Sequence, residues 1–170
     1  YGFTVLSPND VDDGSVDNCS ISNRSLAQSV FTCGNIGTNN VGFSITDNSG
    51  NKASINVNIT VKDTTSPNNK VRNPSVYLNR SGFAILSSFD VDNGSSDNCG
   101  VSKVTLSKDR FNCVDLGKNA VDFTTYDASG NKTVSPITVT VLDTVKPLLR
   151  ATSRPIYLNA NGQQTIPADF

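Results

Sequence analysis

The sequence predicts an all-β fold made of tandem modules of about 80 residues, and three observations lead to this prediction. Compared without gaps, residues 3–67 and 83–147 agree at 29 of 65 positions. Val, Ile, Thr and Phe dominate the apolar stretches, as β-strands prefer. Asp, Asn, Gly and Ser fill the segments between them, as turns prefer. All 15 acidic residues are Asp.

The second repeat is complete and gives the order of the predicted elements. In chain order they are a strand over 75–79, a tight turn over 80–82, a strand over 83–88, an Asp-rich loop over 90–98, a strand over 101–106, and an irregular return over 109–118. Val101, Val104 and Leu106 are the apolar positions that mark the third of these strands.

A long hairpin is predicted to close each repeat. Val121 and Phe123 alternate with polar residues, as do Ile137, Val139 and Val141 on the returning strand. Residues 127–131 (Asp-Ala-Ser-Gly-Asn) form the turn between them, because Gly and Asn tolerate positive φ. Pro136 suits an edge strand or a bulge, because proline donates no ladder hydrogen bond.

Short alternating strands at this spacing indicate β-sandwiches of immunoglobulin type. We expect residues 1–65 to be a module that lacks its first strand, residues 66–146 to be a complete module, and residues 147–170 to supply the opening strands of a third. Those opening strands are candidates for docking on an open sheet edge, such as that of another copy.

The four cysteines occur as two equivalent pairs. Cys19 with Cys33, and Cys99 with Cys113, each enclose about 15 residues. A disulfide closing such a loop contributes about 3 kcal/mol in the chain-entropy model. We therefore predict the disulfides Cys19–Cys33 and Cys99–Cys113, with buried free thiols as the alternative. A zinc site is not predicted, because the chain contains no His and the cysteine spacing differs from that of zinc sites.

Clustered carboxylates in each repeat predict a calcium site. The segment Asp-Val-Asp-x-Gly-Ser-x-Asp-Asn-Cys occurs at 10–19 and again at 90–99. Unpaired carboxylates this close repel one another, and a divalent cation removes that cost. Calcium takes 6–8 oxygen ligands, whereas magnesium seldom sits in a protein-only cage. The predicted ligands are Asp10, Asp12, Asp17, Asp90, Asp92 and Asp97.

Topology adds two further candidate ligands. In an immunoglobulin-like sandwich the loop between the second and third strands shares a pole with the last hairpin and with the incoming linker. Loop 90–97, Asp127 and Asp63 are therefore candidates to converge at the junction between modules, where a cation would stiffen it. In the alternative interpretation these Asp side chains only cap backbone N–H groups in turns.

The ordered motifs resemble a known family. Asp97-Asn98-Cys99-Gly100, then the turn 127–132 (Asp-Ala-Ser-Gly-Asn-Lys), then Val141-Leu142-Asp143-Thr144 are similar to the HYR (hyalin repeat) modules. The version with the Asp-rich loop resembles the repeat arrays of giant Bacteroidetes surface adhesins of the SprB type. The resemblance implies immunoglobulin-like modules in an extracellular, cell-surface filament involved in adhesion or gliding motility, and it identifies no ligand.

Composition argues against several other functions. With a net charge of −1 the chain has no positive electrostatic field that would attract nucleic acid. No apolar run approaches the roughly 20 residues of a membrane span. Without His the usual nucleophilic triads cannot form, so we do not expect an enzyme.

Two functional hypotheses are left. The modules form a calcium- and disulfide-stabilised stalk whose partners are its neighbouring modules, or they bind an extracellular polysaccharide or protein through variable loops.

Overall fold

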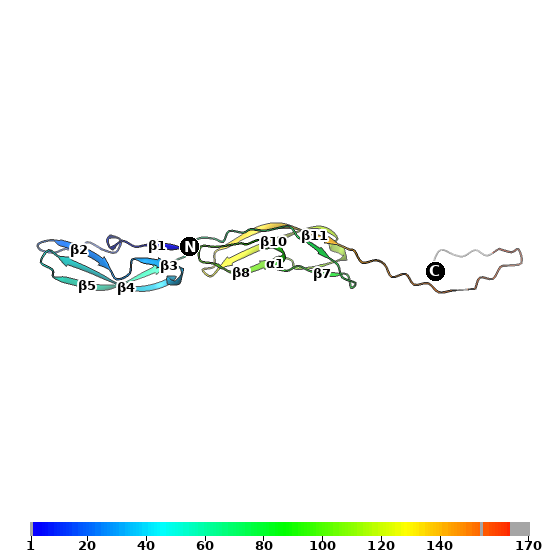
Figure 1. Cartoon of the computed structure of the whole chain (residues 1–170), viewed down its shortest axis with the longest axis horizontal. Helices are drawn as coiled ribbons and strands as arrows, with labels where there is room; N and C mark the ends of the chain where they lie inside the picture. Colours follow the sequence, from blue (N-terminus) through cyan, green and yellow to red (C-terminus); the bar gives the residue numbers. More distant parts are fainter. Residues whose placement is uncertain (1, 154, 164–170) are drawn as a thin grey trace.

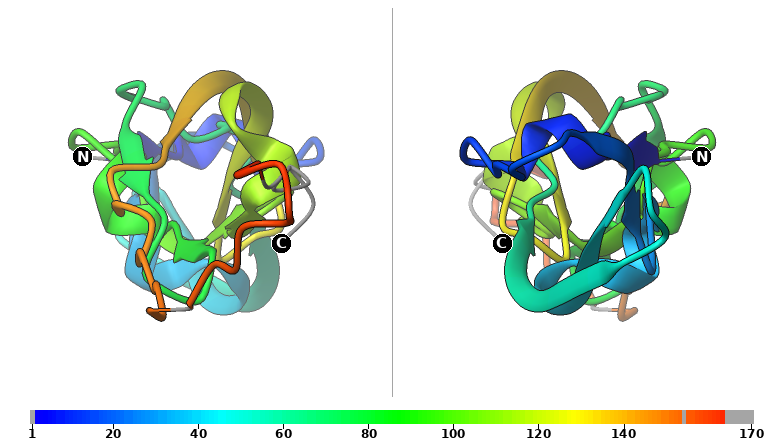
Figure 2. Two further views of the ribbon diagram at one scale, coloured as in Figure 1. Left: turned by 90° about the vertical axis from the view of Figure 1, so that its right-hand side faces the viewer. Right: turned by 90° about the vertical axis from the view of Figure 1, so that its left-hand side faces the viewer.

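The computed structural model describes residues 2–153 and 155–163, and it is built almost entirely from β-strands. We call residues 2–65 the first module and residues 66–146 the second module. The two modules lie end to end along one axis, and an extended C-terminal segment (residues 147–153 and 155–163) leaves the second module at the far end (Figure 1). The views along that axis show the strands of each module wrapping around a common centre (Figure 2).

The second module contains two sheets that share one core. The larger sheet has the strand order β6–β11–β10–β8 and the smaller pairs β7 with β9. The bounds are β6 (Ser75–Tyr77), β7 (Phe83–Ile85), β8 (Val101–Leu106), β9 (Arg110–Asn112), β10 (Gly117–Asp127) and β11 (Lys132–Leu142). Only the β6–β11 pairing is parallel. The predicted all-β class is confirmed.

The β10–β11 hairpin forms where the sequence predicted it. Its register pairs Val121 with Ile137, and Gly130 adopts the φ of +90° that the turn requires. Pro136 lies opposite Asp122 on β10, while β6 pairs only with residues 140–142 on the other side of β11. Pro136 therefore stands where no second strand needs its missing N–H.

Two local elements differ from the sequence prediction. The Asp-rich loop opens with a single helical turn, α1 (Ser88–Val91), which is capped by the Ser87 hydroxyl and by Asp90. The segment expected as an irregular return contains the strand β9 and then a 3₁₀ turn, η3 (Cys113–Asp115). A strand of three residues is too short to be recognised from the alternation of polar and apolar residues.

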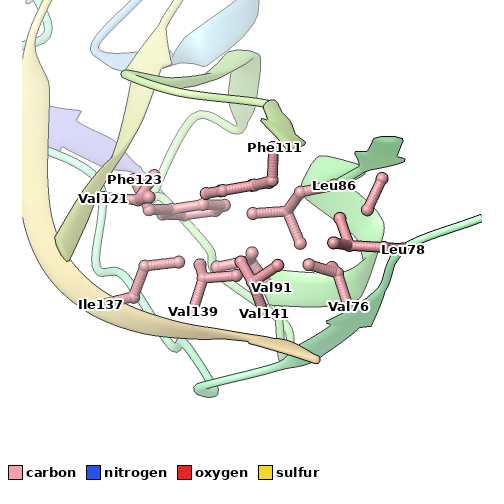
Figure 3. Packing of buried hydrophobic residues seen from close by; sticks show 11 residues of the cluster. Val76, Leu78, Leu86, Val91, Phe111, Val121, Phe123, Ile137, Val139 and Val141 are labelled. Atoms are coloured by element: carbon pink, nitrogen blue, oxygen red, sulfur yellow. The ribbon is translucent and has the colours of Figure 1, made fainter. Parts of the chain in front are cut away.

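The core of the second module is a single apolar cluster drawn from both sheets and from α1 (Figure 3). Phe111 comes from β9, Phe123 from β10 and Val139 from β11, and all three are essentially inaccessible to solvent. The other buried members are Val76, Leu78, Ala84, Leu86, Val91, Val121, Ile137 and Val141. Burial of these side chains is the main favourable term for folding a module of this size.

The first module repeats the same order of elements. They are β1 (Phe3–Val5), η1 (Pro8–Asp10), β2 (Ile21–Leu26), β3 (Val30–Thr32), η2 (Cys33–Asn35), β4 (Gly37–Asp47) and β5 (Lys52–Val61). β2, β4 and β5 form one sheet, and β1 pairs with β3. Within the described residues nothing pairs with the outer edge of β5, where the second module has β6.

That difference weakens the core of the first module. Val57, Ile59 and Val61 are only half-buried or partly exposed, whereas their counterparts Ile137, Val139 and Val141 are buried. Phe31, Val41 and Phe43 are the buried apolar side chains of this module. A missing neighbour for β5 therefore leaves one side of the apolar face uncovered.

The C-terminal segment does not form the strands expected of it within the described residues. Residues 155–163 are exposed and carry no strand, because no strand lies beside them as β11 lies beside β6. The turn is nevertheless formed: Asn159 N–H donates to the Gln163 carbonyl at 3.0 Å, as Asn79 N–H donates to the Phe83 carbonyl at 2.9 Å. Residues 164–170, which include most of the second expected strand, lie outside the described residues.

Truncating equivalent phenylalanines should destabilise the two modules unequally. Phe123 is 0% exposed and its counterpart Phe43 is 7% exposed in a more open core. Phe123→Ala should lower the unfolding free energy of the second module by about 3–5 kcal/mol, because it leaves a cavity in a closed core. Phe43→Ala should cost less. Urea denaturation followed by circular dichroism measures both, and equal losses would contradict the difference in packing.

Candidate metal centre and disulfide at the module junction

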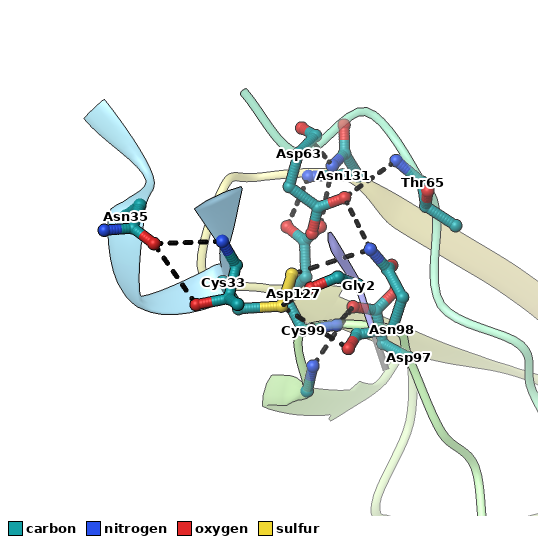
Figure 4. Close-up of a disulfide and its surroundings, with 12 residues drawn as sticks. Gly2, Cys33, Asn35, Asp63, Thr65, Asp97, Asn98, Cys99, Asp127 and Asn131 are labelled. Atoms are coloured by element: carbon teal, nitrogen blue, oxygen red, sulfur yellow. Dashed lines mark hydrogen bonds between the residues drawn. A yellow bond between two sulfur atoms is a disulfide. The ribbon is translucent and has the colours of Figure 1, made fainter. Parts of the chain in front are cut away.

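The junction between the modules is held by a disulfide that joins them. Cys33 of η2 is bonded to Cys99, which directly follows the Asp-rich loop of the second module, 66 residues later (Figure 4). The Cys33 sulfur also lies 3.6 Å from the carbonyl oxygen of Gly2 and 3.5 Å from that of Asn98. The Gly2 N–H donates to the Asn98 carbonyl at 3.1 Å. The start of the first module therefore packs directly on the loop of the second.

The predicted cysteine pairing is corrected by this bond. Neither Cys19–Cys33 nor Cys99–Cys113 is formed; Cys19 and Cys113 are exposed free cysteines. The cause is geometric: within a module the two cysteines belong to opposite ends, since the Asp-rich loop lies at one pole and the turn after β3 or β9 lies at the other. Two modules placed end to end bring one cysteine of each to the same point.

Three carboxylates from three separate segments meet beside the disulfide. One oxygen each from Asp63, Asp97 and Asp127 lie within 4.8 Å of one another. Asp63 belongs to the linker after β5, Asp97 to the Asp-rich loop, and Asp127 to the end of β10. Among residues 2–153 and 155–163 this is the one group of three or more such ligands that close together.

Hydrogen bonds fix each of these carboxylates. Asp97 Oδ2 accepts the N–H groups of Cys99 and Gly100 at 2.8 and 3.1 Å. Asp127 accepts the backbone N–H of Asn131 at 2.8 Å and its side-chain amide at 2.6 Å. Asp63 Oδ1 accepts the Thr65 N–H at 3.1 Å and the Asn98 amide at 3.2 Å. These hydrogen bonds hold the three side chains in place.

Three buried oxygens at this place have no donor. They are Asp63 Oδ2, Asp97 Oδ1 and Asn98 Oδ1. A buried acceptor without a partner costs free energy of the order of 1–3 kcal/mol, and more when it is charged. A cation ligated by these oxygens removes that cost, so the residues present fit a hard divalent ion.

Asp127 stays ionised in spite of its burial. It is only 4% exposed, and burial disfavours its charged form. The hydrogen bonds from the Asn131 side chain and from the N–H groups of Asn131, Gly130 and Ser129 outweigh that effect and lower the pKa of this carboxyl. At neutral pH the junction therefore contains a carboxylate, which is the form that binds metal ions.

Only some of the Asp residues predicted as metal ligands lie in the carboxylate cluster. Asp97 joins the cluster, together with Asp63 and Asp127, the two residues suggested by topology. Asp10, Asp12, Asp90 and Asp92 lie outside this group, and each accepts a backbone N–H in a turn. Asp90 accepts the Ser87 N–H and Asp92 accepts the Ser95 N–H, while Asp10 and Asp12 repeat these bonds with Ser7 and Ser15. Asp17 is exposed and accepts the Cys19 and Ser20 N–H groups.

Asn98 and Asn131 were not among the predicted site residues. The Asn131 side-chain amide donates both to Asp127 and, at 3.0 Å, to the carbonyl oxygen of Asp63, and so connects the linker to the hairpin. Both residues recur with the 80-residue period, as Asn18 and Asn51. That recurrence was the available signal, although Asn is so abundant here that repetition alone does not single out a residue.

Peptide mapping under non-reducing conditions tests the pairing. After alkylation and trypsin digestion we expect one disulfide, Cys33–Cys99, with Cys19 and Cys113 labelled, because only the first two sulfurs are in contact. A linked Cys19–Cys33 or Cys99–Cys113 peptide would contradict the junction described above.

Acid should remove stability through Asp12. Its pKa is lowered from 3.8 to about 2, first by the Ser15 hydroxyl, then by the Ser15 N–H and by Arg24. Because the folded pKa lies below the unfolded one, the ionised carboxylate stabilises the fold above about pH 4, and this contribution is lost as the pH falls towards 2. Asp12→Asn should flatten the fall in melting temperature between pH 4 and pH 2. If the variant loses melting temperature between pH 4 and pH 2 as steeply as the unmodified chain does, Asp12 contributes nothing to the acid sensitivity.

Comparisons with known proteins give no family. No protein-family model matches the chain, and no curated protein matches it. Within the described residues no helix is long and apolar enough to cross a membrane.

Proposed function

We propose that the chain is a stalk segment of an extracellular surface adhesin, in which calcium and a disulfide stiffen the junction between immunoglobulin-like modules. The observation that carries the proposal is the cluster of Asp63, Asp97 and Asp127, which come from both sides of the junction and include two charged oxygens that are buried without a donor.

Calcium is the ion that the donor set favours. The available ligands are carboxylate and amide oxygens only, from Asp63, Asp97, Asp127 and Asn98. Calcium accepts 6–8 such oxygens in flexible geometry, and water molecules complete its shell. Magnesium demands stricter octahedral geometry and dehydrates reluctantly, and zinc prefers nitrogen and sulfur ligands.

The ion acts on the angle between modules. Asp63 stands in the linker, whereas Asp97 and Asp127 belong to the second module, so a bound ion ties the linker to the module that follows. Without a cation three carboxylates repel one another at the point where the modules meet. Calcium converts that repulsion into attraction, and the junction becomes rigid while each module keeps its own core.

The same junction supports the proposed cellular location. A disulfide between modules persists in an oxidising environment, outside the reducing cytosol. Together with the similarity to HYR repeats, this supports a secreted, cell-surface protein that acts in adhesion or gliding motility. Neighbouring modules are its first partners, and its surface ligand is a polysaccharide or protein held by another part of the filament.

Calcium titration tests the proposal with a matched pair of variants. We expect one calcium site per chain by calorimetry, and saturating calcium should raise the melting temperature by several degrees. A ligand at 100 times its Kd adds about 2.7 kcal/mol to the native state. Asp97→Asn should abolish the heat and the shift. Asp17→Asn, at the equivalent but exposed position, should leave both unchanged.

The result that would overturn the calcium assignment is a flat titration together with identical melts in calcium and in EGTA. If Asp97→Asn and Asp17→Asn reduced the heat of calcium binding equally, the ion would instead lie in the individual Asp-rich loops. Small-angle scattering adds a mechanical readout, because removal of calcium should broaden the distribution of end-to-end lengths.

A further inference from the structure

The far end of the second module repeats the surface that the first module presents at the junction. Cys113 is exposed, and its sulfur lies 3.9 Å from the carbonyl oxygen of Gly82. Cys33 lies in the same way 3.6 Å from the carbonyl oxygen of Gly2. A Cβ added to Gly82 would stand 2.9 Å from the Cys113 sulfur, and one added to Gly2 would stand 3.0 Å from the Cys33 sulfur. Both cysteine sulfurs thus lie against a glycine, where a larger residue would crowd them.

The linker residues repeat as well. Asp143 Oδ1 accepts the Val145 N–H at 2.9 Å, as Asp63 Oδ1 accepts the Thr65 N–H at 3.1 Å. A surface groove at this end is lined by Leu78, Asn79, Gly82, Cys113, Asp143 and Val145. The groove at the junction is lined by the counterparts Gly2, Cys33, Asp63 and Thr65, and there Asn98 and Cys99 of the second module complete its lining.

The complementary part is present at the other end of the chain. Asp17 Oδ2 accepts the N–H groups of Cys19 and Ser20 at 2.9 and 3.0 Å, which is the arrangement of Asp97 with Cys99 and Gly100. Cys19 is exposed and free. Each module of this type therefore carries an Asp-Asn-Cys loop at one pole and a cysteine-bearing groove at the opposite pole.

We propose that the groove around Cys113 is the docking site for the Asp-Asn-Cys loop of a following module of the same type, and that Cys113 forms a disulfide with that module's cysteine. The inference goes beyond the proposed calcium function and does not depend on it, because it rests on the Cys33–Cys99 bond and on the 80-residue period. In such an array every junction between modules is covalently cross-linked by a disulfide, in addition to the peptide linker.

The bond forms by ordinary thiol–disulfide exchange. The Cys113 thiol and the incoming cysteine thiol each lose a proton, and one S–S bond forms between them. The two electrons pass to a disulfide oxidant, such as oxidised glutathione, whose own S–S bond breaks to give two thiols. Each module then shares its two cysteines between two neighbours, so the bond within the module does not form.

A lengthened chain tests this directly. Residues 67–146 are inserted a second time after Lys146, which keeps the 80-residue phase and creates a second junction. In variant A the second copy carries Cys113→Ser, and in variant B the first copy carries it. Both are refolded in reduced and oxidised glutathione, alkylated and digested with trypsin. The diagnostic product is residues 81–103 joined to residues 111–118.

The two variants separate the possible pairings. Variant A should contain the diagnostic product, with Cys19 as its single alkylated cysteine. Variant B should lack the product and show three alkylated cysteines. Three alkylated cysteines in A, or the diagnostic product in B, would overturn the proposal, as would loss of the Cys33–Cys99 link from both. The same pairing is expected in EGTA, so a failed calcium titration beside a positive result in A would reject only the proposed calcium function.

Discussion

The arrangement of this chain depends on one contact, the insertion of the Asp97–Cys99 loop between the linker and the pole of the first module. That contact brings Cys33 to Cys99 and Asp63 to Asp97 and Asp127. The disulfide limits how far the modules separate, whereas the carboxylates repel at the same place. In the function proposed above, calcium would offset this repulsion and stiffen the junction, while the disulfide keeps the two modules together.

The repeat explains why identical local sequences have different environments. Asp17 and Asp97 make the same two backbone hydrogen bonds, yet Asp17 is exposed and Asp97 has an oxygen buried at the junction. The difference lies in the neighbours of each loop, because the linker and the end of the first module cover the loop that contains Asp97. Likewise β5 lacks the neighbour that β11 has in β6, and its apolar side chains are more exposed.

Much of the second module could be predicted from residue order alone. The strands around Val76, Val104, Phe123 and Val139 follow from alternation, and the turn at Gly130 follows from its need for positive φ. The helical turn α1 and the short strand β9 were missed, because elements of three or four residues show no full period. At the site, topology suggested Asp63 and Asp127, but nothing in the sequence favoured Asp97 over Asp90 and Asp92, which are equally acidic and lie in the same loop.

The sequence by itself determined the period, the all-β class, the core positions and the pole at which the Asp-rich loop is placed, since these depend on local propensity and on repetition. Tertiary structure alone decided which cysteines bond and which carboxylates meet. A period of 80 residues relates equivalent positions but does not say whether a pair closes within a module or across a junction. Only the end-to-end packing of the modules, which joins residues 66 positions apart, resolves that choice.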